Sequence, residues 1–209
     1  MRVAKELRDG MTVNLGIGLP TLVANFLPEG ATIMLHAENG ILGYGGINPN
    51  DNEWDTDLIN AGGQPVTLID GAAFFDSAAS FAMVRGGHLD LTVLGGLQVS
   101  AKGDLANWAL PGRPGGGIGG AMDLAAGARR VIVAMEHTTR EGEPRILDTC
   151  TYPLTAQECV DLIVTNLAVI EVTPAGLILR ETAPGVTVEQ VVAATDSKLD
   201  TSDVQAMEL

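Results

Sequence analysis

Leu35-His36-Ala37-Glu38-Asn39-Gly40-Ile41-Leu42-Gly43-Tyr44-Gly45-Gly46 is the stretch on which the fold prediction depends. An apolar run, Ala31 to Leu35, leads into it, and an acid, an amide and four glycines follow within a few positions. This change of composition indicates a buried strand that ends in a tight loop. The loop would present the Glu38 carboxylate, and its glycines would let a backbone or a ligand come close.

Two roles for Glu38 are compatible with this local pattern. An acid is common at the start of a helix, where the helix dipole favours negative charge, so Glu38 could cap a helix that follows the strand. A glutamate is also ionised at neutral pH, because its unperturbed pKa lies near ~4.3. An ionised carboxylate can act as a nucleophile. The local sequence leaves both roles open.

The composition predicts one compact α/β domain that spans residues 1–209. The chain has 209 residues, of which 46% are hydrophobic, so it can bury a sizeable core. Its 12 basic and 26 acidic residues give a net charge of 12 − 26 = −14. A surface this acidic argues against a nucleic-acid partner and against binding to an anionic membrane.

The cysteines and the chain start predict a cytoplasmic protein. Cys150 and Cys159 are too far apart for a Cys-x-x-Cys pair and are typical of core residues in a reduced compartment. No apolar stretch approaches the length of a membrane span, and the first residues are amphipathic and unlike a signal peptide.

Common catalytic motifs are missing from the sequence. It contains neither a Gly-x-Ser-x-Gly elbow nor a His-Glu-x-x-His metal motif, so we expect no hydrolase triad and no metal site. His36, His88 and His137 are scattered along the chain, and we interpret each as a structural histidine.

Strands and helices alternate along the chain without an internal repeat. This order predicts an α/β fold with an open, largely parallel sheet and helices on both faces, and a frayed tail over residues 196–209. Active sites of such sheets gather at the carboxyl ends of strands. The residues that sit at such ends are Gly16, Glu38, Gly95 and Glu136.

Two glycine-rich segments suggest close approach to a ligand. Gly16-x-Gly18 lies in a strand–turn–helix unit, but Thr21 stands where a dinucleotide fingerprint needs a third glycine, so NAD is not expected. The run from Pro111 to Gly120 opens onto an alanine-rich helix, Ala121 to Ala128. It could be a loop that binds an anion or oxyanion at the helix start, or a linker.

Seven motifs, in order over nearly the whole chain, resemble the B (beta) subunit of the 3-oxoacid coenzyme A transferases, which are family I CoA-transferases. These motifs are Asn14-Leu15-Gly16-Ile17-Gly18-Leu19-Pro20, Glu38-Asn39-Gly40-Ile41-Leu42-Gly43, Asp57-Leu58-Ile59-Asn60-Ala61-Gly62, Phe81-Ala82-Met83-Val84-Arg85-Gly86-Gly87-His88, Gly103-Asp104-Leu105-Ala106-Asn107-Trp108, Gly119-Gly120-Ala121-Met122-Asp123-Leu124 and Met135-Glu136-His137-Thr138. The resemblance implies transfer of CoA from an acyl-CoA, such as succinyl-CoA, to a 3-oxoacid or another short carboxylate.

The resemblance also implies roles for particular residues. The family's catalytic glutamate falls on Glu38, which would carry a glutamyl-CoA thioester. Asn14 and the Gly120 N–H match the donors of the oxyanion site, although Asn14 could also be a turn-stabilising amide at a strand end. Further residues match positions expected to contact substrate or CoA, and these are Gly16, Gly18, Asn39, Gly40, Gly95, Gly96, Gln98 and Gly119.

The resemblance covers one half of the one-chain members, so it implies a separate A subunit and an α2β2 assembly. The scarcity of cations in this chain fits a partner that supplies part of the CoA phosphate site. Coenzyme A would enter as a substrate and covalent intermediate, with no permanently bound cofactor. Ala37 departs from the family, many of whose members have Ser there. Two other functions remain alternatives, namely an acyl-CoA hydrolase of related fold and a non-catalytic binding module on the sugar-phosphate isomerase-like fold.

Overall fold

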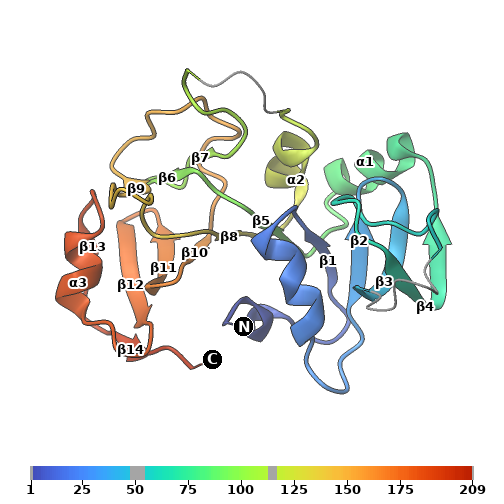
Figure 1. The fold of residues 1–209 in the computed structure, drawn as a ribbon, viewed down its shortest axis with the longest axis horizontal. Coiled ribbons are helices and arrows are strands. Elements are labelled where there is room, and N and C mark those ends of the chain that lie inside the picture. The colour runs from blue at the N-terminus through green and yellow to red at the C-terminus, as the bar shows by residue number, and fades with distance from the viewer. Residues whose placement is uncertain (1, 48–54, 113–116, 209) are drawn as a thin grey trace.

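A computed structural model describes residues 2–47, 55–112 and 117–208. In these ranges the main sheet has eleven strands in the order β13-β12-β11-β10-β8-β5-β1-β2-β3-β4, and β14 pairs with β12 (Figure 1). A second sheet has three strands in the order β7-β6-β9.

Five short parallel strands form the centre of the main sheet. They are β1 (Thr12–Leu15), β2 (Met34–Ala37), β5 (Leu91–Leu94), β8 (Val131–Ala134) and β10 (Leu162–Val164). Nearly all of their residues are buried, as expected for parallel strands covered on both faces. Because the strands run in one direction, their carboxyl ends meet at one edge of the sheet.

Antiparallel strands extend both sides of this centre. On one side lie β3 (Ile41–Ile47) and β4 (Val66–Phe74), and on the other lie β11 (Ala168–Thr173) and β12 (Gly176–Thr182). The sheet is therefore mixed, with a parallel centre. This confirms the predicted α/β class, although the sequence pattern did not separate the antiparallel flanks from the parallel centre.

Helices cover the two faces of the parallel strands (Figure 1). The α-helices α1 (Ser77–Arg85) and α2 (Ala121–Gly127) share one hydrophobic cluster with β5 and β8. The 3-10 helices η1 (Arg2–Glu6) and η2 (Leu19–Phe26) belong to the other cluster, against β1 and β2. The remaining helix, α3 (Val188–Ala193), packs on β11 and β12, and Thr187 closes its first turn with a capping box. The smaller sheet consists of β6 (Gln98–Ser100), β7 (Leu105–Ala106) and β9 (Ile146–Leu147).

The C-terminal residues correct one prediction, because residues 196–208 are not a frayed tail. β13 (Leu199–Asp200) and β14 (Gln205–Ala206) both pair in parallel with β12. Met207 is buried in the cluster that holds η1. Strands of two residues are too short to show a periodic pattern, so only their pairing with an otherwise open strand reveals them.

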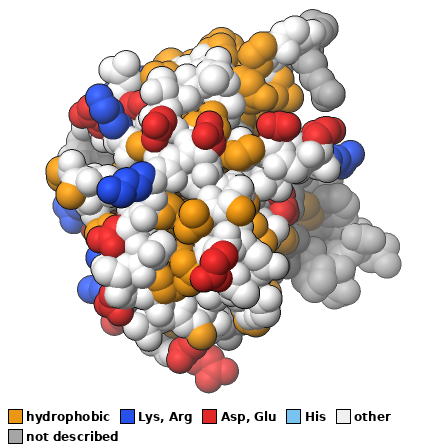
Figure 2. Space-filling model, turned by 90° about the vertical axis from the view of Figure 1, so that its left-hand side faces the viewer, with side chains coloured by type: hydrophobic (Ala, Val, Ile, Leu, Met, Phe, Trp, Pro, Cys, Tyr) orange, Lys and Arg blue, Asp and Glu red, His pale blue; other side chains and the backbone are white. Residues whose placement is uncertain are grey.

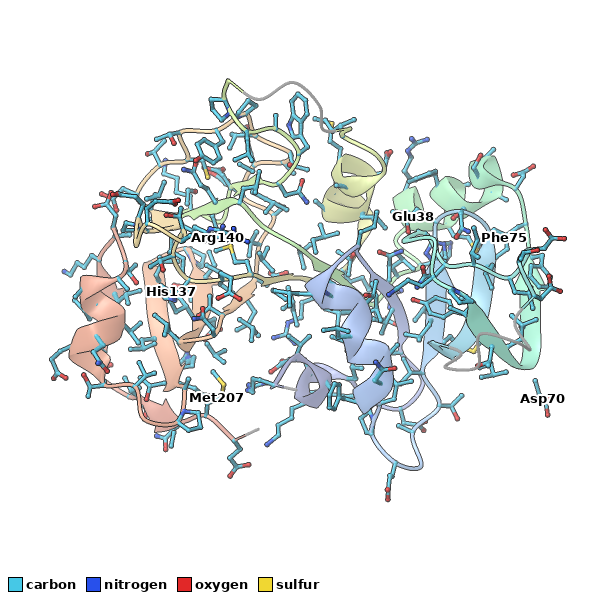
Figure 3. The ribbon with its side chains drawn as sticks, in the orientation of Figure 1. Glu38, Asp70, Phe75, His137, Arg140 and Met207 are labelled. Carbon is cyan, nitrogen blue, oxygen red and sulfur yellow. The ribbon has the colours of Figure 1, made fainter. Side chains whose placement is uncertain are left out.

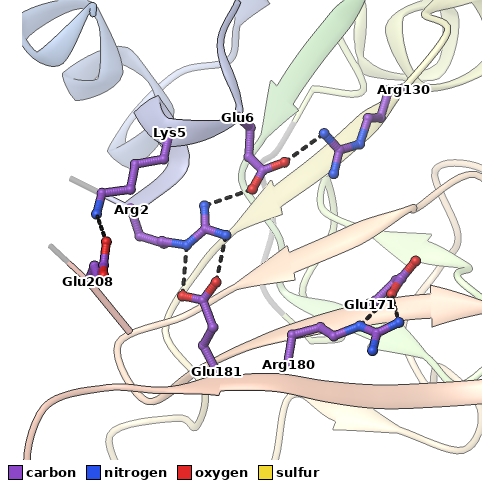
Figure 4. A network of polar contacts seen from close by, with 8 residues as sticks. All are labelled: Arg2, Lys5, Glu6, Arg130, Glu171, Arg180, Glu181 and Glu208. Atoms are coloured by element: carbon purple, nitrogen blue, oxygen red, sulfur yellow. Dashed lines mark hydrogen bonds and ion pairs between the residues drawn. The ribbon is translucent and has the colours of Figure 1, made fainter. Parts of the chain in front are cut away.

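An ion-pair network joins η1 to the sheet (Figure 4). The Arg2 guanidinium donates two hydrogen bonds of 2.8 Å to Glu181 and one of 2.7 Å to Glu6. Glu6 also accepts a 2.7 Å hydrogen bond from Arg130. Bidentate pairing of this kind fixes the orientation of both side chains. The neighbouring pairs in the view are Lys5–Glu208 and Arg180–Glu171.

The surface reflects the acidic composition. On the face drawn in Figure 2, Asp and Glu side chains are spread among hydrophobic and uncharged ones, and Lys and Arg stand singly between them.

No helix in the described ranges combines the length and the apolar character that crossing a membrane requires.

Candidate active site

Glu38 is the first residue of the turn that joins β2 to β3. Ala37 pairs with Ile41 across this hairpin, and the Gly40 N–H donates a 2.9 Å hydrogen bond to the Ala37 carbonyl. Gly40 has φ +125°, and a Cβ there would overlap the Phe75 carbonyl oxygen, so the tight turn requires glycine. A strand follows the turn, so the alternative in which Glu38 caps a helix is wrong.

Asn14 reaches Glu38 because of strand register. Parallel pairing of β1 with β2 places Asn14 beside His36, two residues before Glu38. Asn14 Nδ2 lies 2.9 Å from Glu38 Oε2 and 3.1 Å from the His36 carbonyl oxygen. The amide therefore binds the carboxylate, an interaction that the turn-stabilising alternative did not include.

Gly120 brings the start of α2 against Glu38. A Cβ on Gly120 would lie 2.6 Å from Phe81 Cζ, so glycine lets the Phe81 ring pack there, and it would lie 3.7 Å from Glu38 Cγ, which places this backbone beside the Glu38 side chain. Among the described residues, no hydrogen bond uses the Gly120 N–H. Figure 3 shows Glu38 next to α1 and α2.

A pocket of about 350 Å³ opens beside Glu38 at the carboxyl ends of the parallel strands. Its wall includes five glycines that the sequence singled out, namely Gly16, Gly95, Gly96, Gly119 and Gly120. Gly96 packs so closely that a Cβ there would lie 2.7 Å from Val133 Cγ1. Packing against the core therefore requires glycine at position 96, and the five glycines leave backbone without side chains in the pocket wall.

Four predicted contact residues have structural partners of their own and do not line this pocket. The Asn39 amide donates to the Ile59 carbonyl at 2.8 Å, and Gly40 forms the turn described above. Gly18, with φ +89°, is the N-cap residue before η2, and its carbonyl accepts a 2.8 Å hydrogen bond from the Thr21 hydroxyl.

Gln98, the fourth, is buried at a different pocket. Its amide oxygen accepts hydrogen bonds from the Thr151 and Tyr152 N–H groups at 2.8 and 3.0 Å, and its Nε2 donates to the Thr151 hydroxyl at 2.9 Å. The side chain thus holds the segment that follows Cys150.

Several side chains that line the Glu38 pocket were not predicted as site residues, although the family motifs contain some of them; among them are Ile17, Asn107 and Trp108. The Asn107 amide donates to the Gly95 carbonyl at 3.1 Å and so holds that glycine loop. Trp108 Nε1 donates to the Leu154 carbonyl at 3.2 Å. The sequence feature that could have indicated Asn107 and Trp108 as pocket residues is an amide next to an aromatic residue in a loop between glycine-rich segments.

Burial shifts the pKa of two groups near the site, His36 and Tyr44, and of the two cysteines elsewhere in the fold. It lowers the pKa of His36 to about 4, so the ring is neutral at pH 7. Burial, and then the charge of Glu38, raise the pKa of Tyr44. Burial also raises the pKa of Cys150 to about 11 and that of Cys159 to about 12, which disfavours a thiolate nucleophile.

The structure bears only in part on two predictions, the expected absence of a metal site and the glycine-rich loop Pro111–Gly120. These ranges hold no group of three or more His, Cys, Asp or Glu residues that could bind a metal ion. The Pro111–Gly120 run is described only at its two ends, because residues 113–116 lie outside the described residues. Its last residues, Gly117 to Gly120, line the Glu38 pocket.

Comparison with known proteins gives consistent results. Residues 1–194 match the family model described as coenzyme A transferase. The B chain of a probable succinyl-CoA:3-ketoacid coenzyme A transferase of Bacillus subtilis is 51% identical over 196 residues, which cover 94% of this chain and 90% of that protein. The beta chain of an acetate CoA-transferase of Escherichia coli is 53% identical over 199 residues, which cover 95% of this chain and 90% of that protein.

A solved structure agrees at the level of fold. The acyl-CoA transferase apoenzyme of Escherichia coli O157:H7 superposes with a TM-score of 0.78 at 22% sequence identity. The match covers 97% of this chain and 41% of that one, so this chain spans less than half of the solved chain. The predicted family resemblance is confirmed, and the chain belongs to the coenzyme A transferase family.

Proposed function

We propose that this chain is the B (beta) subunit of a 3-oxoacid CoA-transferase, which moves CoA from an acyl-CoA such as succinyl-CoA to a 3-oxoacid or another short carboxylate. One observation carries the proposal. The Glu38 carboxylate, held by Asn14 Nδ2 at 2.9 Å, faces a glycine-walled pocket at the carboxyl ends of the parallel strands. The names of the relatives, which include 3-ketoacid and acetate transferases, support the choice of substrates.

The chemistry needs a carboxylate that forms and breaks acyl bonds reversibly. A Glu38 oxygen attacks the thioester carbonyl of the acyl-CoA, and the CoA thiolate leaves to give an acyl-glutamyl anhydride. The thiolate then attacks the glutamyl Cδ and releases the donor acid, which leaves a glutamyl-CoA thioester. The acceptor carboxylate runs the same two steps in reverse. Coenzyme A is thus a substrate and a covalent intermediate.

Asn14 and Gly120 suit the two oxyanions of this sequence. When the thiolate attacks the Glu38 Cδ, negative charge develops on the glutamyl oxygen, which is the atom that Asn14 Nδ2 contacts before reaction. The Gly120 N–H, which uses no partner among the described residues, suits the oxyanion of the acyl-CoA carbonyl. The roles of Gly16, Gly95, Gly96 and Gly119 would be to let the acyl and pantetheine groups come close.

The proposal includes an A subunit and an α2β2 assembly. The names of the relatives give them as the B or beta member of a pair, which supports a partner of the other kind. No Lys or Arg is among the described residues that line the Glu38 pocket. Phosphates need donors or positive charge, so a partner that supplies cations for the CoA phosphates fits this pocket. A cytoplasmic location is also part of the proposal, and the two free cysteines agree with a reduced compartment.

Mass spectrometry of the chain purified with its partner subunit tests the function. After brief exposure to succinyl-CoA or acetoacetyl-CoA and reduction with borohydride, the peptide that contains Glu38 should change in mass. Glu38→Gln should remove the modification and lower turnover by roughly 10³-fold or more, because the nucleophile is lost. The matched control is Glu136→Gln, which changes an exposed glutamate that follows β8.

The same experiment separates the alternatives. If thioester is consumed without an acceptor acid while Glu38 stays unmodified, the chain is a hydrolase. If neither consumption nor modification occurs while acyl-CoA binds, the chain is a binding module. The wild-type protein and Glu136→Gln should both give the modified peptide if the transferase proposal is right.

A further inference from the structure

A chain of buried polar side chains lies beneath Glu38. It runs from Thr92 on β5 through Asn14 on β1 and His36 on β2 to Ser80 on α1, and each of these side chains is at most 1% exposed. The Thr92 hydroxyl contacts Asn14 Oδ1 at 3.3 Å, Asn14 Nδ2 contacts His36 Nδ1 at 3.3 Å, and His36 Nε2 contacts Ser80 Oγ at 3.0 Å. Glu38 joins this chain at Asn14, and of these five residues it is the one that lines the pocket.

The donors and acceptors along the chain follow from one another. Asn14 Nδ2 faces the Glu38 carboxylate and the His36 carbonyl, which can only accept, so this atom is the amide nitrogen. His36 Nδ1 faces the same nitrogen at 3.3 Å, the longest of its three contacts, and shares the two amide hydrogens with the Glu38 carboxylate and the His36 carbonyl oxygen. Because a ring proton there would meet those hydrogens, Nδ1 presents its lone pair. The ring proton then lies on Nε2, which donates to Ser80 Oγ.

In this arrangement the His36 ring orients the Asn14 amide. A proton on Nδ1 would point at the Asn14 amide and turn it away from Glu38. The Asn14 side leaves the ring proton on Nε2, and the Ser80 hydroxyl 3.0 Å away can accept it, so Ser80 anchors the far side of the buried ring. Phe75 lies over the ring, with ring centroids 6.0 Å apart and an interplanar angle of 14°, and so restricts its tilt.

We infer that Ser80 and His36 are positioning residues for the transferase reaction: they hold the Asn14 amide, and through it the Glu38 carboxylate, in the attacking orientation. The inference rests on the proposed function, because the orientation of Glu38 matters only if Glu38 is the nucleophile. Positioning of this kind matters because a displacement of about 1 Å in a reacting group can cost on the order of 100-fold in rate.

Single-turnover formation of the Glu38 thioester, measured on the chain with its partner subunit, tests the inference. The amplitude counts folded sites, and the rate constant reports the orientation of the carboxylate. Ser80→Ala should keep the amplitude and the half-saturating acyl-CoA concentration but lower the rate constant by roughly 10- to 100-fold. Ser80→Thr keeps the hydroxyl and should restore most of the rate.

The matched control is Thr195→Val, which removes a hydroxyl from the other buried histidine, His137. This variant should leave the rate constant unchanged. Equal rate constants in Ser80→Ala and wild type would overturn the inference, as would a comparable slowing in Thr195→Val.

A second pair of variants covers the case in which Ser80→Ala does not fold. His36→Asn can place an acceptor oxygen near the Nδ1 position, whereas His36→Leu cannot, so His36→Asn should react faster at equal amplitude. Equal rate constants for these two would contradict the inference. If wild type forms no thioester while acyl-CoA is consumed, the proposed function fails first, and the positioning role falls with it.

Discussion

The molecule buries two histidines in almost the same way and uses them differently. His36 and His137 are at most 1% exposed, and burial lowers the pKa of each to about 4. Each ring nitrogen of His137 meets a threonine hydroxyl at 2.9 Å, from Thr165 and Thr195. Figure 3 shows His137 and Glu38 in separate parts of the molecule.

The difference lies in which groups the hydrogen-bonded side chains around each histidine reach. Around His137, Thr195 also contacts the Val191 carbonyl at 2.8 Å and Thr165 the Ala168 carbonyl at 3.2 Å, so this chain ends on backbone. Around His36 the chain branches at Asn14 to the Glu38 carboxylate, which faces the pocket. Burial and pKa alone therefore do not distinguish a histidine that supports the fold from one that supports a reactive group.

The largest expected contrast between the two clusters comes from Asn14→Ala. This variant removes the donor to the Glu38 carboxyl oxygen and should lower kcat by roughly 10²- to 10³-fold, the usual cost of one oxyanion donor. Thr165→Ala, in the His137 cluster, should leave kcat per folded site unchanged. Steady-state assays with succinyl-CoA check both variants, and similar losses in the two would remove the distinction.

A substitution in a third region, the C-terminal strands, tests whether a loss of packing far from Glu38 lowers the activity. Met207→Ala truncates a buried side chain near the C-terminus and should lower the free energy of unfolding by about 2 kcal/mol or more. Its kcat per folded site should equal that of wild type. Glu208→Ala is the control, because it removes only an exposed ion pair with Lys5 and should change stability by less than about 1 kcal/mol. Urea denaturation and active-site titration give the two quantities.

The smallest expected effect is a loss of folding stability at acid pH, to which both histidines contribute. Each has a folded pKa of about 4 against an ordinary value of 6.5, so between these values the unfolded chain binds a proton that the folded chain does not. Stability is therefore full above about pH 6.5 and falls as the pH drops toward 4. The loss should be on the order of 1 kcal/mol per histidine between about pH 7 and pH 5.5.

Variants assign this acid dependence to each ring. His36→Gln and His137→Gln should each remove a similar share of the loss, measured by urea denaturation at the two pH values. If one histidine accounted for much more of the lost stability than the other, the two sites would differ in burial as well as in the groups that their hydrogen bonds reach.

Much of the fold could be predicted from local pattern. Apolar runs that stop at Gly16, Glu38, Gly95 and Glu136 marked the carboxyl ends of parallel strands. The first three line one pocket, whereas Glu136 is exposed and does not line it. Thr187 is a residue type typical of helix starts, and it caps the last helix with a capping box. The family motifs, which cover most of the chain, identified the family.

Other features depend on contacts that no local pattern contains. The strand after Glu38 runs antiparallel, and the pairs of β13 and β14 with β12 join segments that are each too short to predict. Gln98 was predicted near the substrate and instead holds the segment after Cys150 through its amide.

The sequence by itself determined the kind of chemistry: a carboxylate in a glycine setting at a strand end, within an acidic α/β chain of the coenzyme A transferase family. Only the tertiary structure decided which groups surround that carboxylate. Asn14 meets Glu38 because two parallel strands pair in one register, and Ser80 meets His36 because α1 packs on that face of the sheet. Register and packing join residues far apart in the chain, and composition and spacing do not contain that information.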